Sequence, residues 1–199
     1  GIDPKKSPLR LPLGFKPSTI FAGAPKGATL EGYLFPDTYD FFVDATALDI
    51  INKLHATLET KIPSAWDAEV FKQGKTWHDI LTMASILESE VQSAKDRKIV
   101  AGIFWKRFEN GWPLQADSTV NYATGKKTPS ISSKDRGIDS AYNTYKYKGL
   151  PPGPISNPSL GAMESAIFPE KSVYWFFLTT PSGEVKYAST LEEHTANRK

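Results

Sequence analysis

Residues 76–111 read TWHDILTMASILESEVQSAKDRKIVAGIFWKRFENG, and they contain the signals of two consecutive helices. Thr76 and Ser93 are each followed three positions later by an aspartate, an arrangement similar to a capping box. The apolar residues behind these two start signals recur at helical spacing: Ile80, Ala84, Leu87 and Val91, then Ile99, Val100, Ile103, Phe104 and Phe108. The pattern predicts two packed helices that are joined close to Glu90, the second ending near Gly111.

Three further helices are predicted outside this stretch. Leucine and isoleucine recur at helical spacing over residues 48–58, and Pro63 ends the pattern. Residues 160–167 can form a short helix that is halted by Pro169. Residues 190–193 read TLEE, a capping box that opens a last helix.

Strands are predicted in fewer places. Residues 30–41, LEGYLFPDTYDF, suggest a strand that enters a turn, and residues 120–128 suggest a short strand and turn. Residues 173–179 form an apolar strand that turns at residues 181–183 and pairs back over residues 184–189 as a hairpin. Helices and antiparallel strands are therefore segregated, which favours an α+β fold with helices packed on a small, mostly antiparallel sheet.

The chain has 199 residues, which suits one domain with one sizeable core. Residues 1–29 have little hydrophobic periodicity and several prolines and glycines, so we expect an extended lead-in with one short strand before a domain at residues 30–199. Residues 1–4, GIDP, lack an initiator methionine and are similar to a remnant of an expression vector. The sequence therefore leaves open whether a targeting segment precedes it in the full protein.

Composition argues against several classes of protein. Hydrophobic residues make up 40% of the chain and aromatic residues 12%, which excludes a disordered protein. The formal charge of +2, without a basic run that contains aromatics, argues against nucleic-acid binding. Because the chain has no cysteine, disulfides, thiolate catalysis and zinc–thiolate sites are excluded. No apolar run is long enough for a spanning helix, and there is no signal peptide.

The histidines do not form a metal-binding pattern. His55, His78 and His194 fall in three separate predicted helices, without a second ligand three or four positions away. We therefore expect three surface or half-buried helix residues, and neither a metal nor a cofactor. Nucleophile elbows and phosphate-binding glycine loops are also missing from the sequence, so carboxylates are the remaining candidates for catalysis.

Residues 142–158, YNTYKYKGLPPGPISNP, can form neither a helix nor a central strand. Proline fixes φ and lacks a backbone donor, so the four prolines predict a stiff loop that follows the surface. Its tyrosines and asparagines are able to stack on sugar rings and to bind hydroxyl or amide groups. The alternative is a connector whose tyrosines only anchor it to the body of the protein.

Glu88 and Glu90 stand at the C-terminal end of an otherwise apolar predicted helix. Apolar neighbours and the negative end of the helix dipole both disfavour an ionised carboxyl there, which raises its pKa toward a value that suits a general acid. Because residues two positions apart do not face each other on a helix, the two glutamates are a poor hydrolytic pair, and one would act alone. The alternative is two solvated glutamates at a fraying helix end.

A second polar cluster lies at residues 114–119, LQADST. An extended segment would project Gln115 and Asp117 onto the same face. The alternative is a turn with a local Asx hydrogen bond. Glu31, near Tyr33, and Asp37, beside Pro36, are weaker candidates.

Five segments, in this order along the chain, resemble the endolytic murein transglycosylase family of bacteria, the MltG or YceG-like proteins. They are LEGYLFPDTY at 30–39, MASILESE at 83–90, PLQADSTVNY at 113–122, YNTYKYKGLPPGPISNP at 142–158 and TLEEH at 190–194. The segment at 142–158 is the most specific of them. The sequence departs from the family pattern at four positions: Val91 replaces a small residue, Ser118 a proline, Ser159 a glycine and Lys186 a histidine.

The resemblance implies cleavage of the β-1,4 bond between N-acetylmuramic acid (MurNAc) and N-acetylglucosamine (GlcNAc) in peptidoglycan, without water. The 6-hydroxyl of the muramoyl residue attacks its own anomeric carbon and leaves a 1,6-anhydro end, so the enzyme is a lyase. By motif position, the resemblance assigns the catalytic role to Glu90, with Glu88 as the second choice. The residues implied to line a lysozyme-like glycan cleft are Gln115, Asp117, Tyr142, Asn143 and Tyr145.

Members of this family have one N-terminal membrane helix and a LysM-like module, and neither is evident in this sequence. The resemblance therefore implies the extracytoplasmic catalytic portion of a single-pass protein of the cytoplasmic membrane. Such a protein would work beside peptidoglycan synthases and end nascent glycan strands. The alternatives are a peptidoglycan-binding module without turnover and a scaffold for the synthases.

Overall fold

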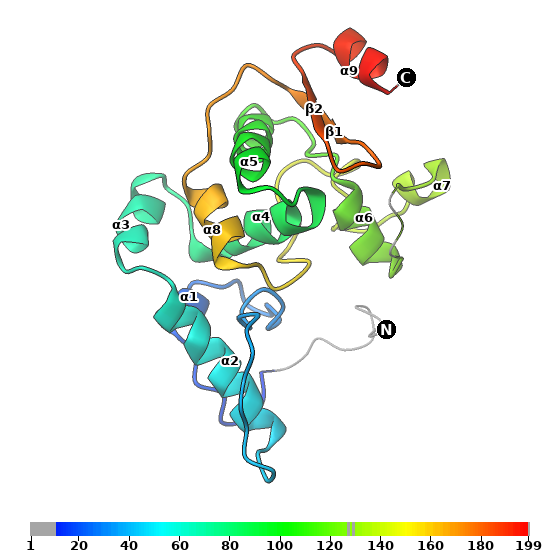
Figure 1. Cartoon of the computed structure of the whole chain (residues 1–199). Helices are drawn as coiled ribbons and strands as arrows, with labels where there is room; N and C mark the ends of the chain where they lie inside the picture. The colour runs from blue at the N-terminus through cyan, green and yellow to red at the C-terminus, as the bar shows by residue number, and fades with distance from the viewer. Residues whose placement is uncertain (1–10, 127, 129, 199) are drawn as a thin grey trace.

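A computed structural model describes residues 11–126, 128 and 130–198 of the chain. Within these residues the fold is mostly helical, with one two-stranded antiparallel sheet (Figure 1). The elements in chain order are α1 (Thr19–Ala22), α2 (Ala47–Lys61), α3 (Ala65–Lys72), α4 (Trp77–Glu90), α5 (Ala94–Glu109), α6 (Asp117–Thr124), α7 (Ser133–Arg136), α8 (Leu160–Ile167), β1 (Phe176–Thr179), β2 (Val185–Ala188) and α9 (Leu191–Asn197).

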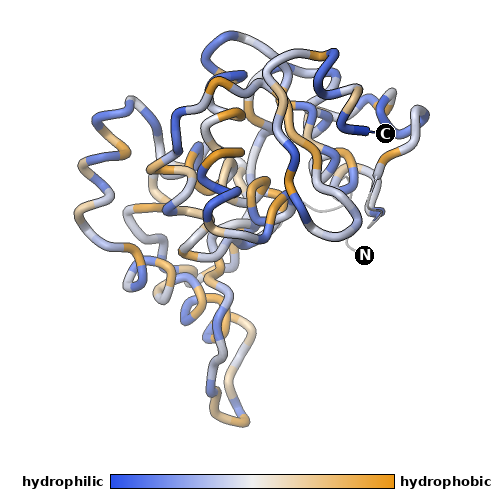
Figure 2. The backbone as a smooth tube through the Cα atoms, turned by 45° about the horizontal axis from the view of Figure 1, so that its top comes forward, coloured by the Kyte–Doolittle hydropathy of each residue, from blue (hydrophilic) through white to orange (hydrophobic). Residues whose placement is uncertain are grey.

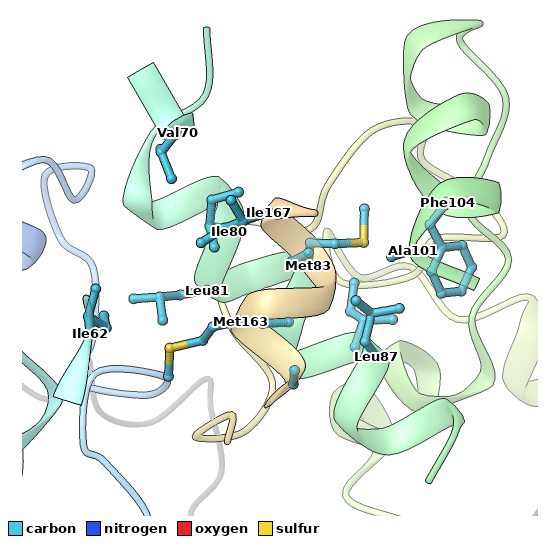
Figure 3. Close-up of a cluster of buried hydrophobic side chains, with 14 of the residues drawn as sticks. Ile62, Val70, Ile80, Leu81, Met83, Leu87, Ala101, Phe104, Met163 and Ile167 are labelled. Atoms are coloured by element: carbon cyan, nitrogen blue, oxygen red, sulfur yellow. The ribbon is translucent and has the colours of Figure 1, made fainter. Parts of the chain in front are cut away.

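Helix α4 is the centre of the core. His78 and all side chains from Ile80 to Leu87 are buried, so the helix is covered on every side, as expected of a core helix. The predicted capping box is present, because Thr76 Oγ1 accepts from the backbone N–H of Asp79 while the Asp79 carboxylate accepts from the backbone N–H of Thr76. Figure 3 shows Met163 and Ile167 of α8 packed among the apolar side chains of α4.

Helix α5 covers another side of α4 and is confirmed where the sequence predicts it. Ser93 accepts from the backbone N–H of Asp96 at its start, and Ala101 and Phe104 contribute to the core (Figure 3). The chain after α8 crosses α5 closely, with the backbone N–H of Glu170 donating to the carbonyl of Lys98 at 2.9 Å. A Cβ atom on Gly102 would overlap the carbonyl oxygen of Glu170, so only glycine permits this crossing.

The predicted hairpin and the helices at 48–58, 160–167 and after Thr190 are all confirmed as β1–β2, α2, α8 and α9. In the hairpin, Phe176 pairs with Ala188 and Thr179 with Val185. The hairpin contacts the end of α4, where Thr179 Oγ1 donates to the carbonyl of Glu90 at 3.4 Å.

Three other local predictions are wrong. Residues 30–41 contain aromatic side chains that are buried, but no strand forms, because the backbone N–H groups of Gly32 and Leu34 donate to the side chain of Asn157 instead of to a neighbouring strand. Residues 117–124 form helix α6, which ends at Gly125 in the left-handed conformation, where a strand and turn are predicted. The lead-in is not simply extended, because its described part, residues 11–29, contains the short helix α1 and no strand. Helices α3 and α7 are not predicted at all.

The three histidines are more deeply buried than expected, with 9% exposure or less. His55 accepts from the backbone N–H of Ser18 at 2.9 Å, and His78 lies 2.7 Å from the hydroxyl of Tyr33. His194 stacks on the ring of Phe176. The hydrogen bonds compensate the burial of His55 and His78, whereas His194 Nδ1 is buried without a hydrogen-bond partner. Within the described residues, no group of three or more candidate ligands could hold a metal ion.

Helix α2 and the loop that precedes it project from the body (Figure 1). The loop before α2 contains the exposed apolar residues Phe42 and Val43, and Figure 2 shows hydrophobic colour at the tip of the projection. None of the described helices has both the length and the apolar character to cross a membrane.

Candidate functional site

Two glutamates at the end of α4 bind two different helices. Glu88 Oε2 accepts from the backbone N–H and the hydroxyl of Ser159, at 3.0 and 2.6 Å, and Ser159 is the N-cap of α8. Glu90 Oε1 accepts from the backbone N–H and the hydroxyl of Ser118, at 3.1 and 2.7 Å, in the first turn of α6. The carboxyls diverge, as their spacing of two residues predicts, and each lies at the positive end of a helix dipole.

Glu90 opens into a large cleft, whereas Glu88 does not line it. The cleft has a volume of about 2030 Å³. Of the residues predicted for the site, five line it: Glu90, Gln115, Asp117, Tyr142 and Tyr145. β1 and the turn after it, from Phe176 to Pro181, also line the cleft. The structure therefore brings together four segments that lie far apart in the sequence.

The environment of Glu90 raises its pKa. Burial of the carboxyl is the main cause, and the negative charge of Asp117 adds to it. The two hydrogen bonds from Ser118 act in the opposite direction, because they stabilise the ionised form, but they do not cancel the effect of burial. A carboxyl with a raised pKa that borders a cleft is suited to donate a proton near neutral pH.

Asp117 is held by Tyr145. The tyrosine hydroxyl donates to Asp117 Oδ1 at 2.5 Å, and the guanidinium of Arg136 lies 5.3 Å from the centre of the tyrosine ring. Burial, together with this hydrogen bond to Asp117, raises the pKa of Tyr145, so the phenol remains a donor at physiological pH. The second carboxyl in the cleft is thus fixed in place by a neutral partner.

Gln115 has an unusual backbone. Its φ of 56° is the only positive value among the described non-glycine residues. The segment is held on both sides: the carbonyl of Leu114 accepts from Arg107 Nη1 at 2.5 Å, while the N–H of Gln115 donates to the carbonyl of Thr144 at 3.0 Å. The extended segment predicted here is therefore wrong, and Gln115 lies in the bend that leads into α6. Such strain persists where the surroundings determine the conformation.

Arg107 is a buried cation at this point of the cleft. Burial lowers its pKa to about 10, so the guanidinium is still charged at neutral pH. Its Nε and Nη2 atoms both donate to the carbonyl of Trp175, at 2.9 and 2.6 Å, next to β1. A single side chain of α5 therefore connects the bend at Leu114 with the hairpin wall.

Asn143 does not line the cleft. The side chain is fully buried, and its Nδ2 donates to the carbonyls of Arg136 and Ile138, both at 2.8 Å. Its Oδ1 accepts from the backbone N–H of Tyr145 at 3.0 Å. All the hydrogen-bonding groups of this amide are thus used within the protein, contrary to the sugar contact that the sequence suggested.

The loop at 142–158 has two parts with different contacts. Tyr142 and Tyr145, in its first part, line the cleft. The second part is anchored to α4, because the carbonyl of Pro152 lies 2.9 Å from His78 Nε2 and the N–H of Ile155 donates to Ser85 Oγ at 3.0 Å. The first half of the loop therefore contributes Tyr142 and Tyr145 to the cleft, while the second half connects the loop to α4 and adds Ile155 to the lining.

Several residues of the cleft have little signal in the sequence. Ser118 is visible there only as a departure from the family pattern, and its contact with Glu90 joins positions 28 residues apart. Tyr122 was expected in a strand, yet on α6 its ring lies 4.8 Å from that of Tyr142. Glu31, a weak candidate from the sequence, lines the cleft beside these rings, and burial raises its pKa.

The whole chain was compared with known proteins. Residues 5–199 match the model of the YceG-like family. The chain is 42% identical over 165 residues to the endolytic murein transglycosylase of Bacillus subtilis, covering 83% of this chain and 46% of that protein. It is 38% identical over 174 residues to the endolytic murein transglycosylase of Streptococcus pneumoniae strain D39, covering 84% of this chain and 31% of that protein.

Structural comparison agrees with these matches. The 2.6 Å crystal structure of a yceG-like protein from Listeria monocytogenes superimposes with a TM-score of 0.80 at 44% sequence identity. The match covers 84% of this chain and 55% of that one, so the chain spans only about a third to a half of the length of these relatives. Since the family match extends over nearly all residues, the chain belongs to the YceG-like family.

Proposed function

We propose that this chain is the catalytic portion of a lytic murein transglycosylase. It cleaves the β-1,4 bond between MurNAc and GlcNAc within peptidoglycan strands and leaves 1,6-anhydroMurNAc ends. The observation that carries the proposal is the arrangement of Glu90: one carboxyl with a raised pKa that borders the cleft, while Glu88 is bound to α8. The names of the curated relatives in Bacillus and Streptococcus support the same reaction.

A single carboxyl suffices for this reaction. Glu90 donates its proton to the glycosidic oxygen as the bond from the muramoyl C1 breaks, and the departing GlcNAc keeps that proton as a hydroxyl. The resulting carboxylate then takes the proton of the muramoyl 6-hydroxyl, whose oxygen forms a new bond to C1. Glu90 is protonated at the end of the reaction as it was at the start, and no water is consumed. A second catalytic carboxyl is therefore not required.

The other residues of the cleft bind and orient the strand. Asp117, fixed by Tyr145, faces the reacting region as an anion that stabilises positive charge developing at the anomeric carbon. Gln115 and Tyr142 offer an amide and a hydroxyl to the N-acetyl and hydroxyl groups of the sugars. Asn143 acts indirectly, since it holds the backbone that presents Tyr145.

The size of the cleft supports a polymeric substrate. Its volume of about 2030 Å³ exceeds the range of roughly 300–1,000 Å³ that is usual for small-molecule pockets. A cleft of this size accommodates several sugars, as cleavage inside a strand requires. We therefore propose an endolytic enzyme that shortens or terminates glycan strands.

The location and partners follow from the substrate. Peptidoglycan lies outside the cytoplasmic membrane, so we propose that the chain acts at the extracytoplasmic face of that membrane, within a longer protein held by an N-terminal helix and beside the peptidoglycan synthases. Residues 30–199 carry the proposed catalytic groups. Residues 11–29 pack against this part of the chain, with Ile20 and Phe21 in its hydrophobic core.

Product analysis in water enriched in oxygen-18 tests the proposal. Uncrosslinked peptidoglycan digested by the wild-type chain is expected to yield anhydro ends that contain no heavy oxygen, identified by mass. Reducing ends labelled with heavy oxygen would show a hydrolase and contradict the intramolecular attack. Binding to glycan strands without any new ends would show a binding module or scaffold. A Glu90→Gln preparation, purified in parallel, controls for contaminating glycosidases.

A further inference from the structure

Ser118 makes a two-point contact with one oxygen of Glu90. Its backbone N–H and its hydroxyl both donate to Oε1, at 3.1 and 2.7 Å. Helix α6 begins without a side-chain cap of its own, because its N-cap residue is Ala116. The carboxyl of Glu90, which comes from α4, therefore supplies the acceptor that the first turn of α6 lacks.

The two oxygens of Glu90 are consequently not equivalent. Oε1 already accepts two hydrogen bonds, and a proton placed on it would displace one of the donors. Oε2 has no hydrogen-bond partner among the described residues. It is also not among the polar side-chain atoms that are buried without a partner, so it is accessible from the cleft that Glu90 lines. When Glu90 is protonated, the proton belongs on Oε2.

We propose that Ser118 is a positioning residue that directs the catalytic proton of Glu90 to Oε2 and sets the pH range in which the enzyme works. This inference rests on the proposed function of Glu90 as the general acid. In the first step Oε2–H protonates the leaving glycosidic oxygen, and in the second Oε2 accepts the proton of the 6-hydroxyl. Throughout the cycle Oε1 stays bound to α6, so the carboxyl does not need to rotate between its two tasks.

The hydrogen bonds from Ser118 also act on the acidity of Glu90. Bonds donated to a carboxylate favour its ionised form, so they counteract the burial that raises the pKa of Glu90. Other groups contribute to the same balance. Asp117 on α6 and Tyr145 in the loop interact with Glu90 through charge. The remaining ionisable groups on the elements around the cleft include Glu31, Arg107, Arg136, His194 and Arg198.

The chain contains a matched control for this contact. Ser159 donates its N–H and hydroxyl to Glu88 at 3.0 and 2.6 Å, nearly the same geometry as the contact between Ser118 and Glu90. Ser159→Ala removes the same kind of bond and a helix cap, but from a carboxyl that does not line the cleft. Any effect of general destabilisation should therefore appear in both alanine variants.

The test is the pH dependence of kcat and kcat/KM for anhydro-end formation by wild type, Ser118→Ala, Ser118→Thr and Ser159→Ala. Activity falls at high pH as Glu90 ionises. In Ser118→Ala the carboxylate loses a donor, the pKa of Glu90 rises, and this falling limb is expected to move up by about one pH unit. Because Oε1 then accepts only the bond from the backbone N–H, the proton is held less strictly on Oε2, and kcat at the optimum should also drop several-fold. Ser118→Thr, which keeps the hydroxyl, and Ser159→Ala should both follow the wild-type limb.

The outcomes separate this inference from the proposed function. A falling limb that stays in place or moves down in Ser118→Ala, or that moves equally in Ser159→Ala, would overturn the role of Ser118 while leaving Glu90 as the acid. An unchanged kcat at the optimum would also overturn it. If Glu90→Gln retained full activity, the proposed function itself would fail, whatever the profile of the serine variants.

Discussion

The two glutamates at the end of α4 differ in what their oxygens contact. Glu88 is bound to Ser159 and has the guanidinium of Arg97 at 4.0 Å, which leaves it with a structural role at the start of α8. Glu90 is bound at one oxygen only and borders the cleft. The spacing of the pair predicts that the two carboxyls diverge, but it does not show which one lines the cleft. That difference depends on contacts with serines 28 and 71 positions away, which no local pattern contains.

A prediction at this scale concerns stability as a function of pH. Because the pKa of Glu90 is raised in the folded protein, its stabilising contribution is complete below the unfolded pKa and is lost as pH rises through the folded pKa. Glu90→Gln cannot ionise, so its melting temperature relative to wild type should increase from about pH 4 to about pH 8. Calorimetry on both proteins measures this difference.

Glu184→Gln is the control, because this residue is exposed in the turn of the hairpin. Its melting temperature should stay close to that of wild type over the same pH range. A difference between Glu90→Gln and wild type that is constant, or that decreases toward high pH, would show that Glu90 is not held in a site that disfavours its charge.

At the scale of elements, a cap together with a long apolar pattern was sufficient to predict a helix, whereas the capped four-residue helices α1 and α7, which begin after Ser18 and Ser132, were missed. Thr46, Thr76, Ser93 and Thr190 each accept from the backbone N–H three residues on, and α2, α4, α5 and α9 follow them. Helix α6 was missed because its cap comes from Glu90, in another part of the chain. Residues 30–41 were misread for a similar reason, since Asn157 replaces the neighbouring strand.

The crossing of the chain over α5 gives a prediction for stability. Gly102→Ala places a methyl group against the backbone of Glu170, which is unable to move aside as a flexible side chain would. Overpacking of this kind typically costs about 1–3 kcal/mol, so the free energy of unfolding in urea should fall by that amount.

Gly161→Ala is the matched control on α8. There the new methyl group would lie 3.3 Å from the flexible end of Arg97, and alanine favours a helix more than glycine does. Its free energy of unfolding should stay the same or rise by up to about 1 kcal/mol. Equal losses in both variants would mean that the tight crossing at Gly102 is not what makes glycine necessary.

On the scale of the whole molecule, the cleft is assembled from segments that are distant in sequence. Glu90 comes from the end of α4, Asp117 from α6, Tyr142 and Tyr145 from the proline-rich loop, and a further part of the lining from the hairpin. The sequence predicted most of these residues as candidates, through motifs that it shares with the YceG-like family. It could not show their mutual positions, because these depend on long-range contacts such as Arg107 with Leu114 and Trp175.

The central claim is that Glu90, and not Glu88, is the acid of this cleft. The most direct measurement is the rate of anhydro-end formation on the same peptidoglycan by Glu90→Gln and Glu88→Gln, with both variants first shown to be folded. Loss of a general acid should lower the rate at least about 100-fold in Glu90→Gln, while Glu88→Gln should stay within about tenfold of wild type. The reverse order, with Glu90→Gln active and Glu88→Gln inactive, would contradict the account.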